Sequence, residues 1–361
     1  MEKVMSRKLI TISTIMTLMS TSVIADVPNV AADIAPIHSL VSRVMDGVGA
    51  PKLIVQSGAS PHGYRLRPSE AKALQDADHV FWMGEELTPW LDSAIGTLAS
   101  KASVTTLLDQ QGVILHDFRE GALFEAHDHS AHGDDDHDDH DDHDDHDDHK
   151  DHDDHDDHDD HKDHDDHDDH DDHDDHKDHD DHDDHDDHDD HGSHDPHAWL
   201  SPENAKLWLN IIASKLSVSD PENAATYFMN AAAGQAEIEA MIAEVKATLK
   251  PVQGGKFVVF HDAYQYFEND FDFYASGAIS LGDSSDPSPA RIEKVQKRIR
   301  DEGIQCVLAE PQFKKGLVAT VMEGSDATAS VIDPLGTELE AGPKLYTQLI
   351  KNMAKTLRNC L

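Results

Sequence analysis

Three histidines share a local setting that would suit a metal site. His62 lies in Ser-Pro-His-Gly-Tyr, His197 in Asp-Pro-His-Ala-Trp, and His261 in Val-Val-Phe-His-Asp. Each lies at or just past the end of an extended segment, and two of them follow a proline. Imidazole nitrogens are good ligands for Zn²⁺, and three of them leave one tetrahedral position for a carboxylate or a water. Any one of these histidines could instead be a capping or core residue, but the shared pattern favours a common site.

Asp333 is the best candidate for a fourth ligand, because it ends the last strand-like segment. The alternatives are that Asp333 is an ordinary turn residue before Pro334, and that a water fills the fourth position. His38, His79 and His116 lie within apparent helical, strand or short apolar patterns. We therefore interpret these three histidines as structural.

Short apolar segments alternate with helical stretches in both the first and the second half of the chain. Strands separated by helices are typical of parallel βαβ units, and in open α/β sheets ligands bind beyond the carboxyl ends of the strands. Histidines at those ends could converge in a cleft between two sheets. The predicted strands are 30–34, 52–56, 79–83, 256–260, 306–309 and 330–332, and the predicted helices are 36–48, 68–76, one opening at 202, 289–302 and 342–359.

One long helix is predicted between the two sets of strands. From Pro221 to Leu249 the only breaker is Gly234, and about 29 helical residues would span roughly 43 Å. A single lobe does not need a helix of that length, so we expect it to join two lobes as a stiff strut. The predicted organisation is α/β, with an N-terminal lobe over 26–220, a linking helix over 221–250 and a C-terminal lobe over 251–361.

The first 25 residues have the features of a secretory signal peptide. Lys3, Arg7 and Lys8 precede an apolar run over 9–24, and small residues stand before a cleavage point after Ala25. A buried helix or a membrane anchor is the alternative, although the run is short for a span of about 20 residues. No cysteine lies near the cleavage point, so we expect release into an oxidising compartment, the periplasm, without a lipid anchor.

Cys306 and Cys360 are the only two cysteines. In an exported protein such a pair predicts one disulfide, and two free buried thiols are the alternative. Nothing resembles the C-x₂-C spacing of a structural zinc site.

An Asp/His-rich insertion over 127–194 carries most of the negative charge. From His137 to His197 a histidine falls at every third position, and residues 127–197 contribute −35 of the net −44, which leaves −9 for the rest. Both net charges are negative, which does not suit nucleic-acid binding. Such a run cannot bury apolar surface, so we predict disorder and several weak Zn²⁺ sites on imidazole and carboxylate. The alternative is a solvated spacer with incidental metal affinity.

The motifs argue against an enzyme. There is no H-E-x-x-H, no Gly-x-Ser-x-Gly and no phosphate-cradling glycine loop, and no glutamate beside the three histidines is placed as an obvious base. A metal-binding protein without catalytic function is the better interpretation, and a zinc hydrolase the weaker one.

Six segments, in order, resemble those of the cluster A-I zinc-binding proteins of ABC importers, the ZnuA family. The resemblance covers nearly all of the mature chain outside the insertion, and it implies two Rossmann-like lobes, a rigid backbone helix, a metal site in the cleft between the lobes, and metal ligands at His62, His197 and His261. The segments are Pro36-Ile37-His38-Ser39-Leu40, Ser60-Pro61-His62-Gly63-Tyr64 with 66–69, 195–202 around His197, 259–264 around His261, Ala309-Glu310-Pro311-Gln312-Phe313, and Asp333-Pro334-Leu335-Gly336.

The resemblance also implies the cargo and the partners. Manganese-carrying relatives typically have a carboxylate where this chain has His261, which favours one tight Zn²⁺ site. Some zinc members place a glutamate where this chain has Pro61, so the fourth ligand stays open between Asp333 and a water. We expect a monomeric periplasmic protein that delivers zinc to an ABC permease, with a periplasmic zinc chaperone as a further partner. The alternative is a periplasmic zinc buffer with no dedicated permease.

Overall fold

The computed structural model describes residues 27–119, 124, 194–280, 282, 287–313 and 315–361. The described residues belong to one compact unit. The predicted signal peptide over 1–25 lies outside the described residues, as does the Asp/His-rich insertion except for His194.

The first half of the chain forms a parallel four-stranded sheet in the order β2-β1-β3-β4. Short apolar segments such as His79-Val80-Phe81-Trp82 are buried along their whole length, as strands covered on both faces must be. Prolines at the first or second helical position open all three helices of this half. The elements are β1 (Val30–Ala32), α1 (Ala35–Val44), β2 (Lys52–Leu53), α2 (Pro68–Gln75), β3 (His79–Trp82), α3 (Pro89–Leu98) and β4 (Ser103–Thr106).

The second half repeats this topology with a parallel sheet in the order β6-β5-β7-β8. In both sheets the chain goes first to one side of its first strand and then to the other. Each sheet therefore has a topological switch point between its two central strands, where ligands bind in such folds. The elements are β5 (Phe257–His261), α6 (Gln265–Phe271), β6 (Ala278–Ser280), α7 (Pro289–Glu302), β7 (Cys306–Ala309), α8 (Lys315–Met322) and β8 (Thr328–Val331).

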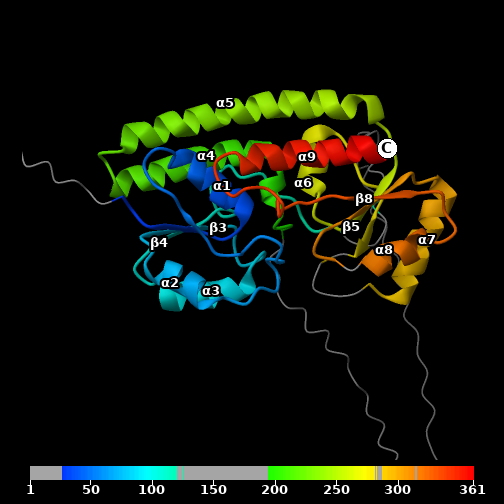
Figure 1. The fold of residues 1–361 in the computed structure, drawn as a ribbon, viewed down its shortest axis with the longest axis horizontal. Helices are drawn as coiled ribbons and strands as arrows, with labels where there is room; N and C mark the ends of the chain where they lie inside the picture. Colours follow the sequence, from blue (N-terminus) through cyan, green and yellow to red (C-terminus); the bar gives the residue numbers. More distant parts are fainter. Residues whose placement is uncertain (1–26, 120–123, 125–193, 281, 283–286, 314) are drawn as a thin grey trace, which may run out of the picture. The chain divides into compact units, whose positions relative to one another are not determined.

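Three helices pack beside both sheets: α4 (Pro202–Ser219), α5 (Ala224–Leu249) and α9 (Leu345–Cys360), with short 3₁₀ turns at Ala198–Leu200 and Lys250–Val252. Helix α5 has 26 residues, about 39 Å, and contacts α1, α4 and α9 (Figure 1). It begins three residues later than predicted because the Asp220 carboxylate accepts hydrogen bonds from Asn223 and Tyr227 and shapes a turn. The role of α5 as a link between lobes with the boundaries given above stays a prediction.

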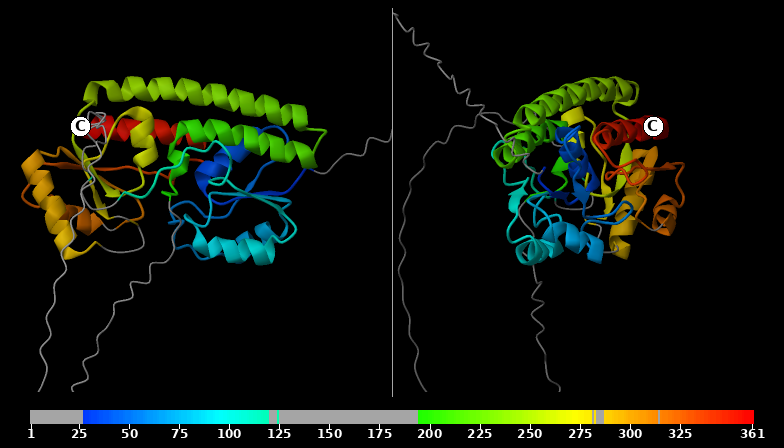
Figure 2. Two further views of the ribbon diagram at one scale, coloured as in Figure 1. Left: turned by 180° about the vertical axis from the view of Figure 1, so that it is seen from behind. Right: turned by 60° about the vertical axis from the view of Figure 1, so that its left-hand side comes forward.

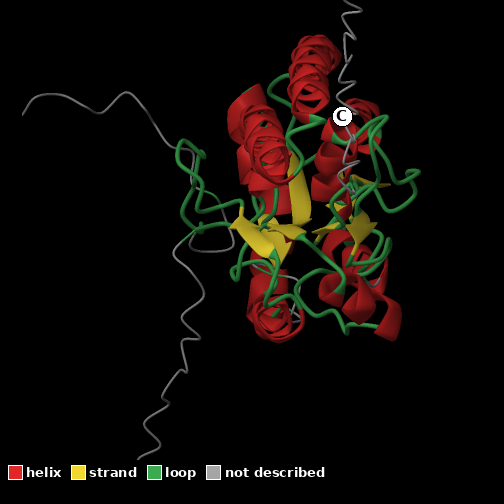
Figure 3. Cartoon of the chain, turned by 90° about the vertical axis from the view of Figure 1, so that its left-hand side faces the viewer, coloured by secondary structure: helices red, strands yellow, loops and turns green. Residues whose placement is uncertain are grey.

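One continuous core joins the two halves. It runs from β1 and α1 through α4 and α5 to β5, α6 and α9. A smaller cluster lies under α2 and α3 against the other face of the first sheet, and another under α7 and α8 against the second. Figures 2 and 3 show the resulting order of layers, with helices on both faces of the strands.

The α/β class and the two-sheet organisation predicted from the sequence are confirmed. The predicted disulfide is present between Cys306, at the start of β7, and Cys360, the last residue of α9. Among the described residues, no helix is both long enough and apolar enough to cross a membrane. Five elements were not predicted because they are short or weakly patterned: α3, β4, α6, β6 and α8.

Candidate metal centre

The structure brings His62, His197 and His261 together. One ring nitrogen of each lies within 4.8 Å of the others. Among the described residues, these three form the group of His, Cys, Asp or Glu side chains whose donor atoms are close enough to share a metal ion. His197 and His261 are 5% and 3% exposed, and His62 is half-buried. The expected convergence of the three histidines is therefore observed, although only His261 ends a strand.

His261 is the last residue of β5, at the switch point of the second sheet. Strand β7 lies beside β5, and Glu310 follows directly after its last residue, Ala309. The two side chains meet there, with His261 Nδ1 2.6 Å from Glu310 Oε1 and both buried. Gln312 Nε2 donates to the other oxygen of Glu310 at 3.1 Å. The position of His261 thus follows from the parallel register of two neighbouring strands.

His197 lies just before the 3₁₀ turn that leads into α4. Asp195 Oδ1 accepts a hydrogen bond from the His197 backbone N–H at 3.0 Å and lies 2.6 Å from its Nδ1. Trp199 Nε1 donates to the carbonyl of Pro334 at 2.8 Å, which ties this turn to the second half. Ser201 Oγ accepts from Asn204 N and so caps α4. The residues of the motif around His197 therefore make contacts that hold its imidazole in place.

His62 belongs to the loop between β2 and α2. Trp90 Nε1 donates to the carbonyl of Pro61 at 2.7 Å, and the Trp90 ring lies against Tyr64 with 5.6 Å between centroids. Glu70, in the first turn of α2, accepts hydrogen bonds from Tyr64 Oη and the Arg67 backbone N–H. These contacts hold both sides of the loop, and the His62 ring lies 5.5 Å from that of His197.

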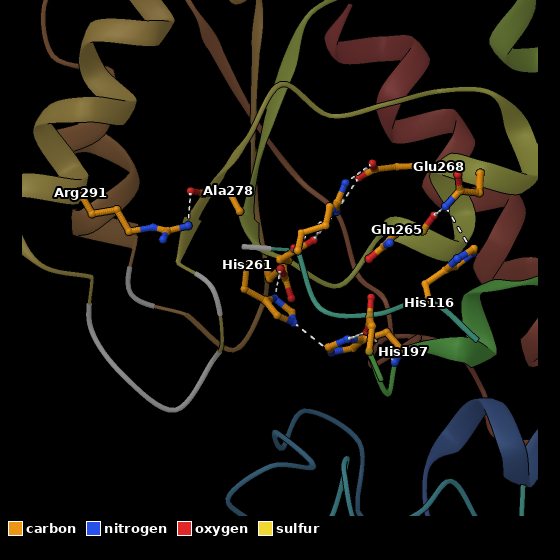
Figure 4. Close-up of polar contacts among 12 residues, drawn as sticks. His116, His197, His261, Gln265, Glu268, Ala278 and Arg291 are labelled. Carbon is orange, nitrogen blue, oxygen red and sulfur yellow. Dashed lines mark hydrogen bonds and ion pairs between the residues drawn. The ribbon is translucent and has the colours of Figure 1, made fainter. Parts of the chain in front are cut away.

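The two buried imidazoles present their Nε2 atoms to one another. His197 Nε2 and His261 Nε2 are 3.4 Å apart (Figure 4). Because each Nδ1 faces a carboxylate, Nδ1 carries the hydrogen and Nε2 the lone pair. A cation between two nitrogens arranged in this way would be bound by both. Zinc–nitrogen bonds of about 2.05 Å at the tetrahedral angle place two nitrogens roughly 3.3 Å apart, which matches the observed separation.

Asp333 lies outside this group of donor atoms. Its Oδ1 accepts from the backbone N–H groups of Leu335 and Gly336, and its Oδ2 accepts from the N–H and hydroxyl of Thr337. The structural interpretation of His38, His79 and His116 agrees with their surroundings: His38 lies near the Pro51 carbonyl, His79 near Ser219, and His116 near Asn269.

Negative charge surrounds the two buried histidines. Burial raises the pKa of Asp195 to about 6, although the His197 N–H opposes this. Burial likewise raises the pKa of Asp262 and of Glu268, and the Arg119 guanidinium lowers both. With a pKa of about 6, Asp195 is still mostly ionised at pH 7, and its charge against the His197 ring favours a bound cation. Asp262 and Glu268, by contrast, are paired with Arg119.

Several residues beside the two buried ligands were not predicted from the sequence. Asp195 and Glu310 stand inside quoted motifs, two residues before His197 and at the end of the strand next to His261, so their position was a usable signal. Arg119 had none, because its carboxylate partners lie more than 140 residues away in sequence.

Comparison with known proteins now identifies the family. The profile of the family described as "Zinc-uptake complex component A periplasmic" (ZnuA) matches residues 30–360. The chain belongs to the ZnuA family. The high-affinity zinc uptake system protein ZnuA of Brucella abortus is 47% identical over 332 residues, covering 92% of this chain and 91% of the relative. The ZnuA of Paracoccus denitrificans is 43% identical over 338 residues, covering 93% of each chain.

Solved structures of ZnuA share the fold. A crystal structure of ZnuA aligns with a TM-score of 0.63 at 18% identity, covering 92% of this chain and 100% of that one. A zinc-bound ZnuA deletion mutant aligns with a TM-score of 0.64 at 18% identity, covering 93% and 98%. At these identities the likeness supports the ZnuA fold alone.

Proposed function

We propose that this protein captures Zn²⁺ in the periplasm on His62, His197 and His261 and delivers it to the membrane permease of an ABC-type zinc importer. The observation that carries the proposal is the pair of Nε2 atoms at 3.4 Å, each set by a carboxylate on the opposite ring nitrogen. Histidine with a carboxylate on its far nitrogen is a recurrent zinc ligand. Membership of a family of zinc-uptake components supports zinc as the cargo.

We assign the fourth coordination position to a water rather than to Asp333. Both carboxylate oxygens of Asp333 already accept hydrogen bonds from the turn that follows it. Turning Asp333 toward the metal would leave three backbone N–H groups without that acceptor, which is costly where they are part-buried. Zinc affinity should therefore change little in an Asp333→Asn variant if the turn is kept. If Asp333 were a ligand, the same variant would bind zinc at least tenfold more weakly.

Delivery and buffering are distinguished by growth under zinc chelation. A strain that lacks its own zinc-binding component but keeps the permease should grow when supplied with the wild-type chain and fail with the His261→Ala variant. Growth rescue that persists in a strain without the permease would favour the alternative, a periplasmic zinc buffer. The family has a transport role rather than a known catalytic one, which favours a binding protein over a zinc hydrolase.

For the Asp/His-rich insertion we propose a zinc collector with several weak sites beside the tight one. Histidine and carboxylate at a three-residue repeat supply many ligands. At pH 7 most of the imidazoles are neutral and can therefore bind a metal ion. Removing residues 127–190 should leave one tight site and lower zinc uptake only when zinc is scarce. Unchanged uptake under scarcity would contradict a collector and favour a spacer.

We also propose that cleavage after Ala25 releases the mature chain as a periplasmic monomer. The disulfide between Cys306 and Cys360 suits an oxidising compartment. N-terminal sequencing of the periplasmic fraction should begin at Asp26, and sedimentation should give one chain per particle. A chain that begins at Met1 would overturn the signal-peptide assignment.

A further inference from the structure

The residues that flank the insertion form a small, well-contacted stem. We define the stem as residues 114–119 and 194–197. Asp117 and His194 form an antiparallel bridge, and the Asp195 N–H donates to the His116 carbonyl at 2.8 Å. Tyr266 of α6 holds both sides, because its hydroxyl donates to the Asp195 carbonyl at 2.7 Å and accepts from the His116 N–H at 3.1 Å. The stem is thus attached to the second half beside the two buried ligands.

Arg119 makes the strongest contact of the stem with the second half. Its Nε lies 3.0 Å from both oxygens of Asp262, and its Nη2 also contacts Asp262. Its Nη1 lies 2.6 Å and its Nη2 3.3 Å from the two oxygens of Glu268. The ring of Phe124 stacks on the guanidinium with 3.6 Å to its centroid. The Arg119 side chain is only 15% exposed, Asp262 7% and Glu268 1%.

This contact reaches the metal centre through one peptide bond. Asp262 follows His261 directly, in the tight turn where the Ala263 N–H donates to the His261 carbonyl at 3.0 Å. A planar guanidinium that binds two carboxylates fixes their direction as well as their charge. Fixing Asp262 therefore restricts rotation of the turn that ends β5. A metal site tolerates only about 0.5 Å of error in its ligands, so such a restriction matters at His261.

We propose that Arg119 is a positioning residue for zinc: acting through Asp262, it holds His261 opposite His197 and joins the stem of the insertion to the half that carries His261. This inference rests on the proposed zinc-binding function. It assigns to the stem a direct effect on the tight site, separate from any zinc bound along the insertion.

Arg43 provides a matched control. It also makes a two-point contact with a carboxylate across two elements, with Nε and Nη2 at 3.1 Å and 3.0 Å from Glu237, and its side chain is 14% exposed. Its pair joins α1 to α5, and neither residue contacts a ligand. Arg43→Met thus removes an arginine of similar exposure, paired with one half-exposed carboxylate, without touching the turn at His261.

The test compares zinc affinity and zinc dissociation rate in the full chain for wild type, Arg119→Met, Arg119→Lys and Arg43→Met, by competition with a chelator. Removal of a group that orients a metal ligand typically costs roughly 10–100-fold in affinity. We expect that loss in Arg119→Met, a smaller loss in Arg119→Lys, which keeps the charge but not the fork, and a change below about twofold in Arg43→Met. Equal affinity in the Arg119 and Arg43 variants would overturn the proposal.

Arg119→Met leaves two carboxylates buried without their cation, which could destabilise the fold. A second variant therefore separates this charge effect from the loss of positioning. Arg119→Met with Asp262→Asn and Glu268→Gln removes the charges together. Positioning predicts that this variant folds and still binds zinc at least tenfold more weakly, whereas recovery of wild-type affinity would mean that only charge balance was lost. The effect of Arg119→Met should also persist without residues 127–190, and its disappearance would contradict a direct action on His261. If wild type itself showed no tight zinc site, the proposed function would fail before this inference is tested.

Discussion

His197 and His261 lie on a buried side of the cluster, where Asp195 and Glu310 each hold one imidazole, whereas His62 lies on a loop side, between β2 and α2. On the buried side, strand register and short-range contacts determine where each nitrogen points. On the loop side, Trp90 holds the backbone of the loop through Pro61, and His62 itself is half-buried. The difference suggests that the buried side is preorganised for the metal and that the loop side closes the site and opens it.

This difference makes entry and release of zinc a local event. The two halves share one continuous core and the long helix α5 contacts helices from both, so a large hinge motion would expose buried apolar surface. Movement of the loop that carries His62 would not. Hydrogen exchange should therefore be faster in residues 56–67 than in 257–262 when zinc is absent.

The largest effect should come from the ligands themselves. If the ~10–16 kcal/mol of a four-ligand zinc site is shared among its ligands, one imidazole contributes about 3 kcal/mol, or more than a hundredfold in affinity. We expect at least this loss for His197→Ala and His261→Ala. His62→Ala should lose less, with most of its effect on the dissociation rate. Competition titration and stopped-flow release measure both, and equal losses at all three positions would remove the distinction between the two sides.

The next effect concerns the carboxylates of the buried side. Asp195→Asn and Glu310→Gln keep the size of the side chain but weaken the acceptor at Nδ1, and roughly 10–100-fold weaker zinc binding is expected. Glu70→Gln is the matched change on the loop side, where Glu70 contacts Tyr64 and Arg67 but no metal ligand. It should cost less than threefold. A larger loss for Glu70→Gln than for Glu310→Gln would contradict the proposed division.

A smaller effect is expected from the anchor of the loop. Trp90→Phe removes the hydrogen bond to the Pro61 carbonyl, which is worth about 1 kcal/mol, so zinc should dissociate up to about fivefold faster while its association is little changed. Trp82→Phe is the control, since Trp82 Nε1 donates to Thr106 Oγ1 away from the site. The prediction fails if both variants release zinc at the wild-type rate.

The disulfide should have no effect on zinc affinity, although it matters for stability. Cys306 and Cys360 are 54 residues apart, and in the loop-entropy description such a link contributes about 4 kcal/mol to the free energy of unfolding. The double change to serine should lower the denaturation midpoint of the metal-free protein and leave the zinc dissociation constant within twofold. A large loss of affinity would show that the end of the second sheet bears on the site.

The sequence was most informative where a local rule determines the structure. Buried strands, prolines that open helices and a histidine at the end of β5 could be recognised from pattern and spacing, and the family motifs identified the same three histidines. Short elements such as β6 and α8 lacked a clear period, and they depend on packing within the second half, β6 against β5 and α8 against α7 and β7. Arg119 could not be found at all, because its partners Asp262 and Glu268 are distant in sequence and only folding brings them together.

Zinc titration of the protein lacking residues 127–190, combined with X-ray absorption spectroscopy of the one-to-one complex, tests the central claim most directly. We predict one tight site per chain, with three imidazole nitrogens at about 2.0–2.1 Å and one oxygen, and loss of that signature in His261→Ala. More than one tight site, fewer than three imidazoles in the shell, or a spectrum unchanged in His261→Ala would contradict the assignment of His62, His197 and His261 as the zinc ligands.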